Sequence, residues 1–430
     1  MSKQPIAFGT ALRKRRTTAG WSLTRLAMAV HYSKGHLSKV ETGLKRPTSE
    51  LARLCDAALC ADGALTALVP PPEATEAAPL PESRPDEEVW IMQWDADGSV
   101  RFAAMDRRRA LALGASCLLA VAAGEEPATA SPVDAGLLQA SRAMFDQYRR
   151  LGQYAEPGAL VPPLVAQAQA LRDLATRSAG GTRRGLLVLA SRYAEFAGWM
   201  AQESGNDRAA SWLTRRAVDL AEAGGDRHLA TYALARQALI SFYAGDAPAT
   251  IDLSGRAAAT KDAPPRIRGL AAQQEAQGHA LAGDHRACMR RLETARALLG
   301  ADTEDPDLPV IGSSNLTDPV SMATGWCLYD LGRPQQAADI LDAETARLPG
   351  HSVRNQVRYG MRRALSHAAA GHIEHACSVA GALLGPVSQV GSATVQADVR
   401  RLARLLTRHS SNAAVREITP QLTSALRPTA

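Results

Sequence analysis

The part of the sequence whose residue types best fit a specific chemistry lies between residues 22 and 43. Ser33 is suited to cap a short helix that runs to about residue 42, with Leu37 and Val40 on its inward face. The outward face then carries small and basic residues: Lys34, Gly35, Ser38 and Lys39. Such a face suits a DNA major groove, because long donors reach guanine edges and small residues permit close approach.

A second helix precedes this one, and it adds sites for phosphate. Ser22 is suited to cap it, and it runs to about Val30 with Leu23 and Leu26 on one face. The free N–H groups at the start of both helices, at Ser22 and Ser33, favour an anion such as a DNA phosphate. The sequence of these two helices therefore predicts a DNA-binding surface.

The distribution of charge along the chain also favours DNA binding by the N-terminal residues. The chain has a formal net charge of +6, and residues 1–68 contain eleven Lys and Arg against four Asp and Glu. Residues 69–100 reverse the sign, with eight acidic residues and only Arg84 among the bases. The positive field is therefore concentrated on the first module, as nucleic-acid binding requires.

Residues 12–43 resemble the Xre/Cro-type helix-turn-helix family of bacterial transcription regulators. In that family an arginine of the first helix pairs with a glutamate that ends the recognition helix, and Arg16 and Glu41 occupy those places. The closing pattern of the motif is matched by Glu41-Thr42-Gly43 and Pro47. Two positions depart from it: Leu23 stands where a glutamine often touches phosphate, and His31 stands where the turn usually has glycine.

The resemblance implies which side chains contact DNA. Base contacts are expected from Lys34, Gly35, Ser38 and Lys39, with His36 as a weaker candidate that is equally explained as a solvated residue. Phosphate contacts are expected from Ser22, Ser33, Thr42 and Arg46. Trp21 is expected in the core, where it does not stack on bases.

The chain is predicted to be all-α with three parts. Residues 1–69 form a helix-turn-helix domain of four to five helices, and residues 70–105 form a linker rich in proline and acids. Within that linker, alternating residues around Asp95-Ala96-Asp97-Gly98 indicate a small β-hairpin that docks on the helical body. Residues 106–430 form a helical-repeat domain for sensing and dimerisation.

The repeats are visible as glycines at a regular spacing. Gly205, Gly245, Gly283, Gly332 and Gly371 each begin a similar turn, and a small residue follows five positions later: Ala210, Thr250, Cys288, Ala337 and Ala376. A glycine between two helices and a small residue at their crossing are typical of stacked helical hairpins. The units resemble tetratricopeptide-type repeats over residues 183–406, with an insertion at residues 302–319; another kind of helical repeat is the alternative.

Other chemistry is weakly represented. His367, His372, Glu374, His375 and Cys377 have metal-ligand side chains, but their spacing gives no complete ligand set, so neither a metal nor another cofactor is expected. Nucleotide-binding and hydrolase motifs are absent from the sequence, so we expect no catalytic residues and no enzyme. The apolar run at residues 110–124 is too short for a membrane span, and the six scattered cysteines indicate a reducing cytoplasm.

The leading interpretation is a cytoplasmic, homodimeric regulator that binds double-stranded DNA. Peptide-responsive regulators of Gram-positive bacteria share this layout, so the repeats are expected to respond to a peptide, small-molecule or protein effector. The alternative is a protein-interaction scaffold, in which the repeat surface binds partners and the N-terminal module docks protein instead of DNA.

Overall fold

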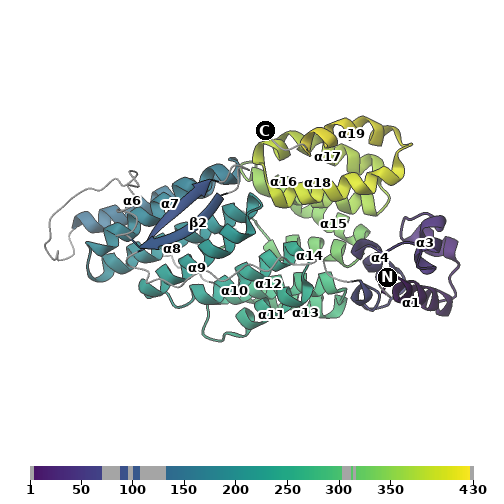
Figure 1. The fold of residues 1–430 in the computed structure, drawn as a ribbon, viewed down its shortest axis with the longest axis horizontal. Helices are drawn as coiled ribbons and strands as arrows, with labels where there is room; N and C mark the ends of the chain where they lie inside the picture. Colours follow the sequence, from purple (N-terminus) through teal and green to yellow (C-terminus); the bar gives the residue numbers. More distant parts are fainter. Residues whose placement is uncertain are drawn as a thin grey trace.

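The structure, a computed structural model, describes residues 4–69, 88–94, 100–106, 132–302, 311–312 and 316–426. In these ranges it is helical apart from one β-hairpin, which confirms the predicted fold class (Figure 1). The linker residues 70–87 and the apolar run at residues 110–124, which the sequence indicated to be too short for a membrane span, lie outside the described residues.

The N-terminal module consists of four α-helices and a 3₁₀ turn: α1 (Gln4–Thr18), α2 (Leu23–Ala29), α3 (Lys34–Glu41), α4 (Ser49–Ala58) and η1 (Thr66–Leu68). Apolar side chains from all of these helices meet in one core, in which Phe8, Leu12, Leu37, Val40 and Leu51 are fully buried. The module therefore has a hydrophobic core of its own.

The predicted hairpin is present as strands β1 (Glu88–Trp94) and β2 (Val100–Asp106). The strands pair antiparallel, with Glu88 opposite Asp106 and Trp94 opposite Val100. β1 lies against α7 and β2 against α9, so the hairpin docks on the helical body, as an isolated two-stranded ribbon must do to be stable.

The body continues with pairs of antiparallel helices. Their bounds are α6 (Pro132–Leu151), α7 (Pro157–Thr176), α8 (Gly180–Glu203), α9 (Asp207–Ala223), α10 (Leu229–Ala244), α11 (Ala247–Ala259), α12 (Pro265–Ala282), α13 (His285–Gly300), α14 (Pro319–Asp330), α15 (Pro334–Thr345), α16 (Val353–Ala369), α17 (Ile373–Val390), α18 (Ala393–Leu406), η3 (Thr407–His409) and α19 (Ala413–Ala425). From α7 onward each helix packs on its neighbour in sequence, whereas α6 packs on α8, and α10, α12, α14, α16 and α18 also pack in succession.

The glycine pattern explains this stacking. All five predicted turn glycines have a positive φ, between 72° and 89°, which is a left-handed conformation that suits glycine. The small residues five positions later are all fully buried, with 0% exposure. The repeat architecture is therefore confirmed, and the predicted insertion is the long connection between α13 and α14.

One feature of the body was not predicted: the last repeats close onto the first. Arg354 in α16 donates to Gly152 O over 2.6 Å and to Ala155 O over 2.6 Å, at the junction of α6 and α7. α18 in turn packs on the end of α8. The helices therefore curve round until distant parts of the chain meet.

The closing contact is centred on Glu203, the last residue of α8, which is 1% exposed. Its carboxylate pairs with Arg358 and with Arg354, the latter over 3.4 Å, and accepts hydrogen bonds from Ser392 over 2.6 Å and Thr394 over 3.1 Å. Burial alone would raise the pKa of Glu203, but the two guanidinium groups lower it below its usual value. The buried charge is therefore fully compensated.

Among the helices that the structure describes, none combines the length and the hydrophobicity that a membrane-spanning segment requires.

Replacing Glu203 by alanine should lower the free energy of unfolding by about 3–5 kcal/mol, because it leaves two buried guanidinium groups without their carboxylate. Urea denaturation followed by circular dichroism measures this loss. Asp252→Ala is the control, because Asp252 forms a solvent-exposed pair with Arg256 and its removal should change little. Equal effects of the two changes would show that Glu203 does not hold the closure.

Candidate nucleic-acid interface

Helices α2 and α3 begin where the sequence predicted. The Ser22 hydroxyl accepts a hydrogen bond from Arg25 N over 3.1 Å, and the Ser33 hydroxyl accepts one from His36 N over 3.2 Å. Both serines are N-caps in an extended conformation. The capped ends fix the direction of each helix.

The turn between these helices is tight. His31 has a φ of 52°, so it adopts the left-handed conformation that its place in the motif implied, although it carries a side chain. A close approach of α1 to α3 was not anticipated: a Cβ atom on Gly9 would lie 2.4 Å from Val40 O. Glycine at this position lets α1 pass directly across the end of α3.

A charged fork joins the first helix to the end of the third. Arg16 donates from Nε to Glu41 Oε1 over 2.6 Å and from Nη2 to Glu41 Oε2 over 2.9 Å. Its third nitrogen, Nη1, donates to Trp21 O over 2.9 Å. The hydrogen bond with Glu41 raises the pKa of Arg16. This bidentate pair fixes α3 relative to α1.

The outward face of α3 is open to solvent. Lys34, Gly35, Ser38 and Lys39 are all exposed, and a Cβ atom on Gly35 would meet nothing within 4 Å. The phosphate candidates Ser22, Ser33, Thr42 and Arg46 are exposed as well. Both predicted sets are therefore accessible at the surface of the N-terminal module.

His36 differs from its neighbours on α3. Its ring is half-buried and packs edge-on against Tyr32, with 5.0 Å between the ring centroids. Burial lowers the pKa of His36, and the nearby Lys45 ammonium lowers it further, with 3.4 Å between Lys45 Nζ and His36 Nδ1. Lys45 is exposed beside this face, and sequence reasoning did not single it out.

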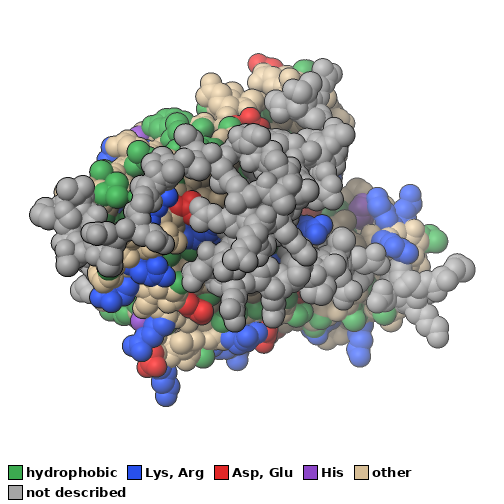
Figure 2. All heavy atoms as spheres, turned by 60° about the vertical axis from the view of Figure 1, so that its left-hand side comes forward, with side chains coloured by type: hydrophobic (Ala, Val, Ile, Leu, Met, Phe, Trp, Pro, Cys, Tyr) green, Lys and Arg blue, Asp and Glu red, His purple; other side chains and the backbone are tan. Residues whose placement is uncertain are grey.

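The surface around this site is basic. Figure 2 shows Lys and Arg side chains at the receding right-hand end of the molecule, where Figure 1 draws the N-terminal module. Trp21 is half-buried against the core, and the Arg25 guanidinium lies 4.3 Å from the centre of its ring. Capped helices, a braced end and an exposed basic face thus occur together.

Residues 7–69 match the helix-turn-helix domain family. The match covers the whole described core of the N-terminal module and none of the repeats. No curated protein matches the chain. Among solved structures, a Rap protein complexed with Competence and Sporulation Factor is similar at 14% sequence identity and a TM-score of 0.41, covering 67% of this chain and 87% of that one.

A second candidate site lies inside the curved repeat body. A cavity of about 490 Å³ is bounded by residues of α6, α8, α10, α12, α14 and α16 and by the insertion between α13 and α14. Gly312, within the predicted insertion, lines it, whereas residues 313–315 lie outside the described part of the chain.

The cavity wall holds polar atoms without protein partners. The Oε1 atoms of Gln273, Gln274 and Gln277 on α12 have no hydrogen-bond partner among the described residues, and neither do Tyr243 OH and Trp326 Nε1. Gln277 and Trp326 are each 3% exposed, so these groups are poorly placed to contact bulk solvent. Buried polar groups are normally satisfied, and a wall of this kind is suited to a polar ligand.

The same wall is basic and aromatic. Six arginines and two carboxylates line it, and most of these arginines also pair with acids, as Arg236 does with Glu195 over 3.3 Å. The indole of Trp326 lies 5.4 Å from Phe242 and 5.8 Å from Tyr243, measured between ring centroids. The cavity can therefore accept both apolar groups and negative charge.

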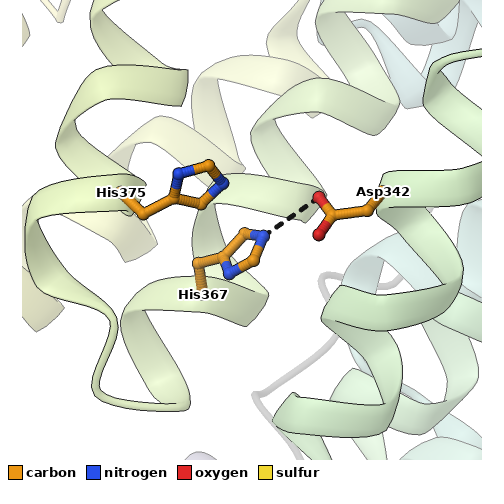
Figure 3. A group of neighbouring side chains, drawn as sticks. All are labelled: Asp342, His367 and His375. Carbon is orange, nitrogen blue, oxygen red and sulfur yellow. Dashed lines mark hydrogen bonds and ion pairs between the residues drawn. The ribbon is translucent and has the colours of Figure 1, made fainter.

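The histidine cluster that the sequence analysis set aside is partly assembled. Figure 3 shows Asp342, His367 and His375 close together. His367 Nε2 lies 3.0 Å from Asp342 Oδ1. Arg363 also pairs with Asp342, and its Nη2 lies 3.5 Å from His375 Nε2. A guanidinium between the carboxylate and the histidine opposes a second cation, so we interpret this cluster as a structural ion-pair network.

Replacing Arg16 by alanine should loosen α3 without unfolding the body, because Glu41 would lose two charged hydrogen bonds worth about 1–3 kcal/mol. We expect faster hydrogen exchange at the α3 amides, measured by mass spectrometry. Arg13→Ala is the matched control, since Arg13 is exposed on the same helix. Unchanged exchange in Arg16→Ala would show that the fork does not brace the recognition helix.

Proposed function

We propose that this protein is a sequence-specific DNA-binding transcriptional regulator. In this proposal residues 1–69 bind DNA and residues 106–430 sense an effector and dimerise, while residues 70–105 link these two parts. The observation that carries it is the exposed basic face of α3, which is held by Arg16 and Glu41 within a module that matches the helix-turn-helix domain.

In the proposed complex α3 enters the major groove. Lys34 and Lys39 donate to base edges such as guanine O6 and N7, while Gly35 and Ser38 are short enough to let the helix lie close to the bases. The N-termini of α2 and α3 approach phosphates on either side, together with Thr42 and Arg46. His36 contributes less, because its ring is already engaged with Tyr32.

Two copies of α3 are needed to read a site of useful length. In a two-fold symmetric dimer the recognition helices contact half-sites about one DNA turn apart, so the operator is expected to be an inverted repeat. We therefore propose a homodimer with contacts through the repeat body.

We propose that the effector binds in the cavity and that it is a short peptide. In the proposed complex these buried side chains rotate toward the cavity, so that the glutamine oxygens of α12 accept from N–H groups and Tyr243 and Trp326 donate to carbonyls, which are the two groups of a peptide backbone. Aromatic side chains suit apolar peptide residues, and the arginine-rich wall suits a terminal carboxylate. A volume of about 490 Å³ lies within the range of small-ligand sites.

Replacing Lys34 or Lys39 by alanine should each weaken specific DNA binding by about 1–3 kcal/mol. The operator is first selected from a random duplex library with the unmodified protein, and affinities are then measured by fluorescence anisotropy. Lys261→Ala is the control, because Lys261 is exposed on the repeat body. Binding should also weaken steeply with salt. A salt-independent interaction, or equal affinities in all variants, favours the protein-docking scaffold instead.

Replacing Gln277 by leucine should weaken peptide binding without lowering the stability of the protein. The free energy of unfolding should stay the same or rise, because an unpartnered buried oxygen disappears, whereas stabilisation by short synthetic peptides should fall. Thermal unfolding with and without a peptide library measures both. Gln356→Leu is the control and should destabilise the protein, since Gln356 donates to Pro349 O over 2.8 Å. Peptide stabilisation that survives Gln277→Leu would contradict this site.

A further inference from the structure

Three turns of the repeat body lie in close contact with the helix-turn-helix module. A Cβ atom on Gly283 would lie 2.7 Å from Gly63 Cα, and one on Gly332 would lie 2.5 Å from Arg53 O. A Cβ atom on Gly371 would lie 3.0 Å from His31 Cε1. Gly283 and Gly332 approach the backbone of the module so closely that only glycine fits, whereas Gly371 lies against the His31 ring.

These contacts come from equivalent places in successive repeats. Gly283 follows α12, Gly332 follows α14 and Gly371 follows α16, and all three have the same left-handed conformation. Equivalent turns of stacked repeats lie along one edge of the array. Figure 1 shows the module at that edge, with α4 beside α15.

Charged side chains reinforce these contacts. Arg408, in η3, lies with its guanidinium 3.8 Å from the centre of the Tyr32 ring and donates to Tyr32 OH over 2.6 Å. It also lies 3.5 Å from Glu50 Oε2. Arg53 of α4 is 3.9 Å from Asp330, which is 2% exposed.

We propose that the turns after α12, α14 and α16, together with Arg408, form an intramolecular docking surface that fixes the direction in which α3 faces DNA. We call this surface the turn seat. The proposal rests on the proposed function for its consequence at DNA, but the docking itself can be tested without DNA.

The turn seat holds the module without covering its DNA face. The seat contacts His31, Tyr32, Glu50, Arg53 and Gly63, whereas the outward residues of α3 remain exposed. Docking is therefore compatible with DNA binding. Its effect is to remove rotational freedom from the module, which helps two copies of α3 to meet two half-sites at once.

The three helices that carry the turn seat also line the cavity. Gln277 belongs to α12, Trp326 to α14 and Arg358 to α16, and each of these helices is followed by one of the seat glycines. A change in the relative position of these helices moves the seat directly. The repeat body thus positions the DNA-binding module, and the position depends on the helices that surround the cavity.

Spin-label distances in the full-length protein test the seat. Labels are placed at Met28→Cys on α2 and Asp252→Cys on α11, both exposed, with Cys60 and Cys117 changed to serine. The labelled protein is mixed with an excess of unlabelled protein, which suppresses distances between the two copies of a dimer, so a docked module gives one narrow distance distribution. A broad distribution in the otherwise unmodified protein would overturn the proposal.

Each substitution in the turn seat is paired with a control substitution, so that loss of docking can be distinguished from loss of folding. Gly332→Ala should broaden the distribution, because its Cβ atom meets the backbone of α4, whereas Gly225→Ala should not. Gly225 has a φ of 84° and only Arg184 Cδ at 3.8 Å, so it carries the same backbone strain without the clash. Likewise Arg408→Ala should broaden the distribution, and Arg404→Ala, an exposed neighbour, should leave it narrow. Narrow distributions in both seat variants would refute the seat.

A DNA-binding measurement tests separately whether the turn seat orients α3 on DNA. With the operator selected by the unmodified protein, Gly332→Ala should bind the complete site about tenfold more weakly or worse, and a single half-site equally well. Equal loss on both duplexes would contradict the orienting role. If no operator can be selected, the proposed function fails, while the spin-label distances still decide whether the module is docked.

Discussion

The arrangement of the repeat body depends on one buried carboxylate. Glu203 ends α8, and the arginines and hydroxyls that surround it come from α16 and from the start of α18, more than 150 residues later. A buried ion pair contributes little net stability compared with apolar packing, but it tolerates very few geometries. Its consequence is curvature: the helical array closes at this point, and the cavity lies between helices that include α8 and α16, which the contact joins.

Local physical rules account for what the sequence could predict. Ser22 and Ser33 are capping residues, and the turn glycines need a left-handed backbone; both requirements are set by a few neighbouring residues. The small residues after each glycine are buried for the same local reason, because two helices cross there. Even the pair of Arg16 and Glu41, 25 residues apart, was implied by a motif with a fixed length.

Contacts between distant segments could not be predicted. Nothing around Arg354 distinguishes it from the many other arginines in the chain, yet it is completely buried and bonds to the backbone 202 residues earlier. The close contact of Gly9 with α3 and that of Gly332 with α4 depend on tertiary packing, and a glycine in a sequence does not name its neighbour. The unpartnered oxygens of α12 were invisible for the same reason, because curvature decides whether a glutamine faces solvent or a cavity.

Repeated structure explains how a cavity and a DNA-binding surface come to share the same helices. In a stacked array each repeat contributes one helix to the inner wall and one turn to the edge, so any three neighbouring repeats offer a wall and a row of turns together. Here the inner wall carries Gln277, Trp326 and Arg358, and the corresponding turns hold the module. An effector acts only through its differential affinity for two arrangements, and contacts with three helices that also set the seat provide a physical basis for that difference. Because two of these turns meet the backbone of the module directly and the third meets the His31 ring, a shift of α12, α14 or α16 changes the position of the module.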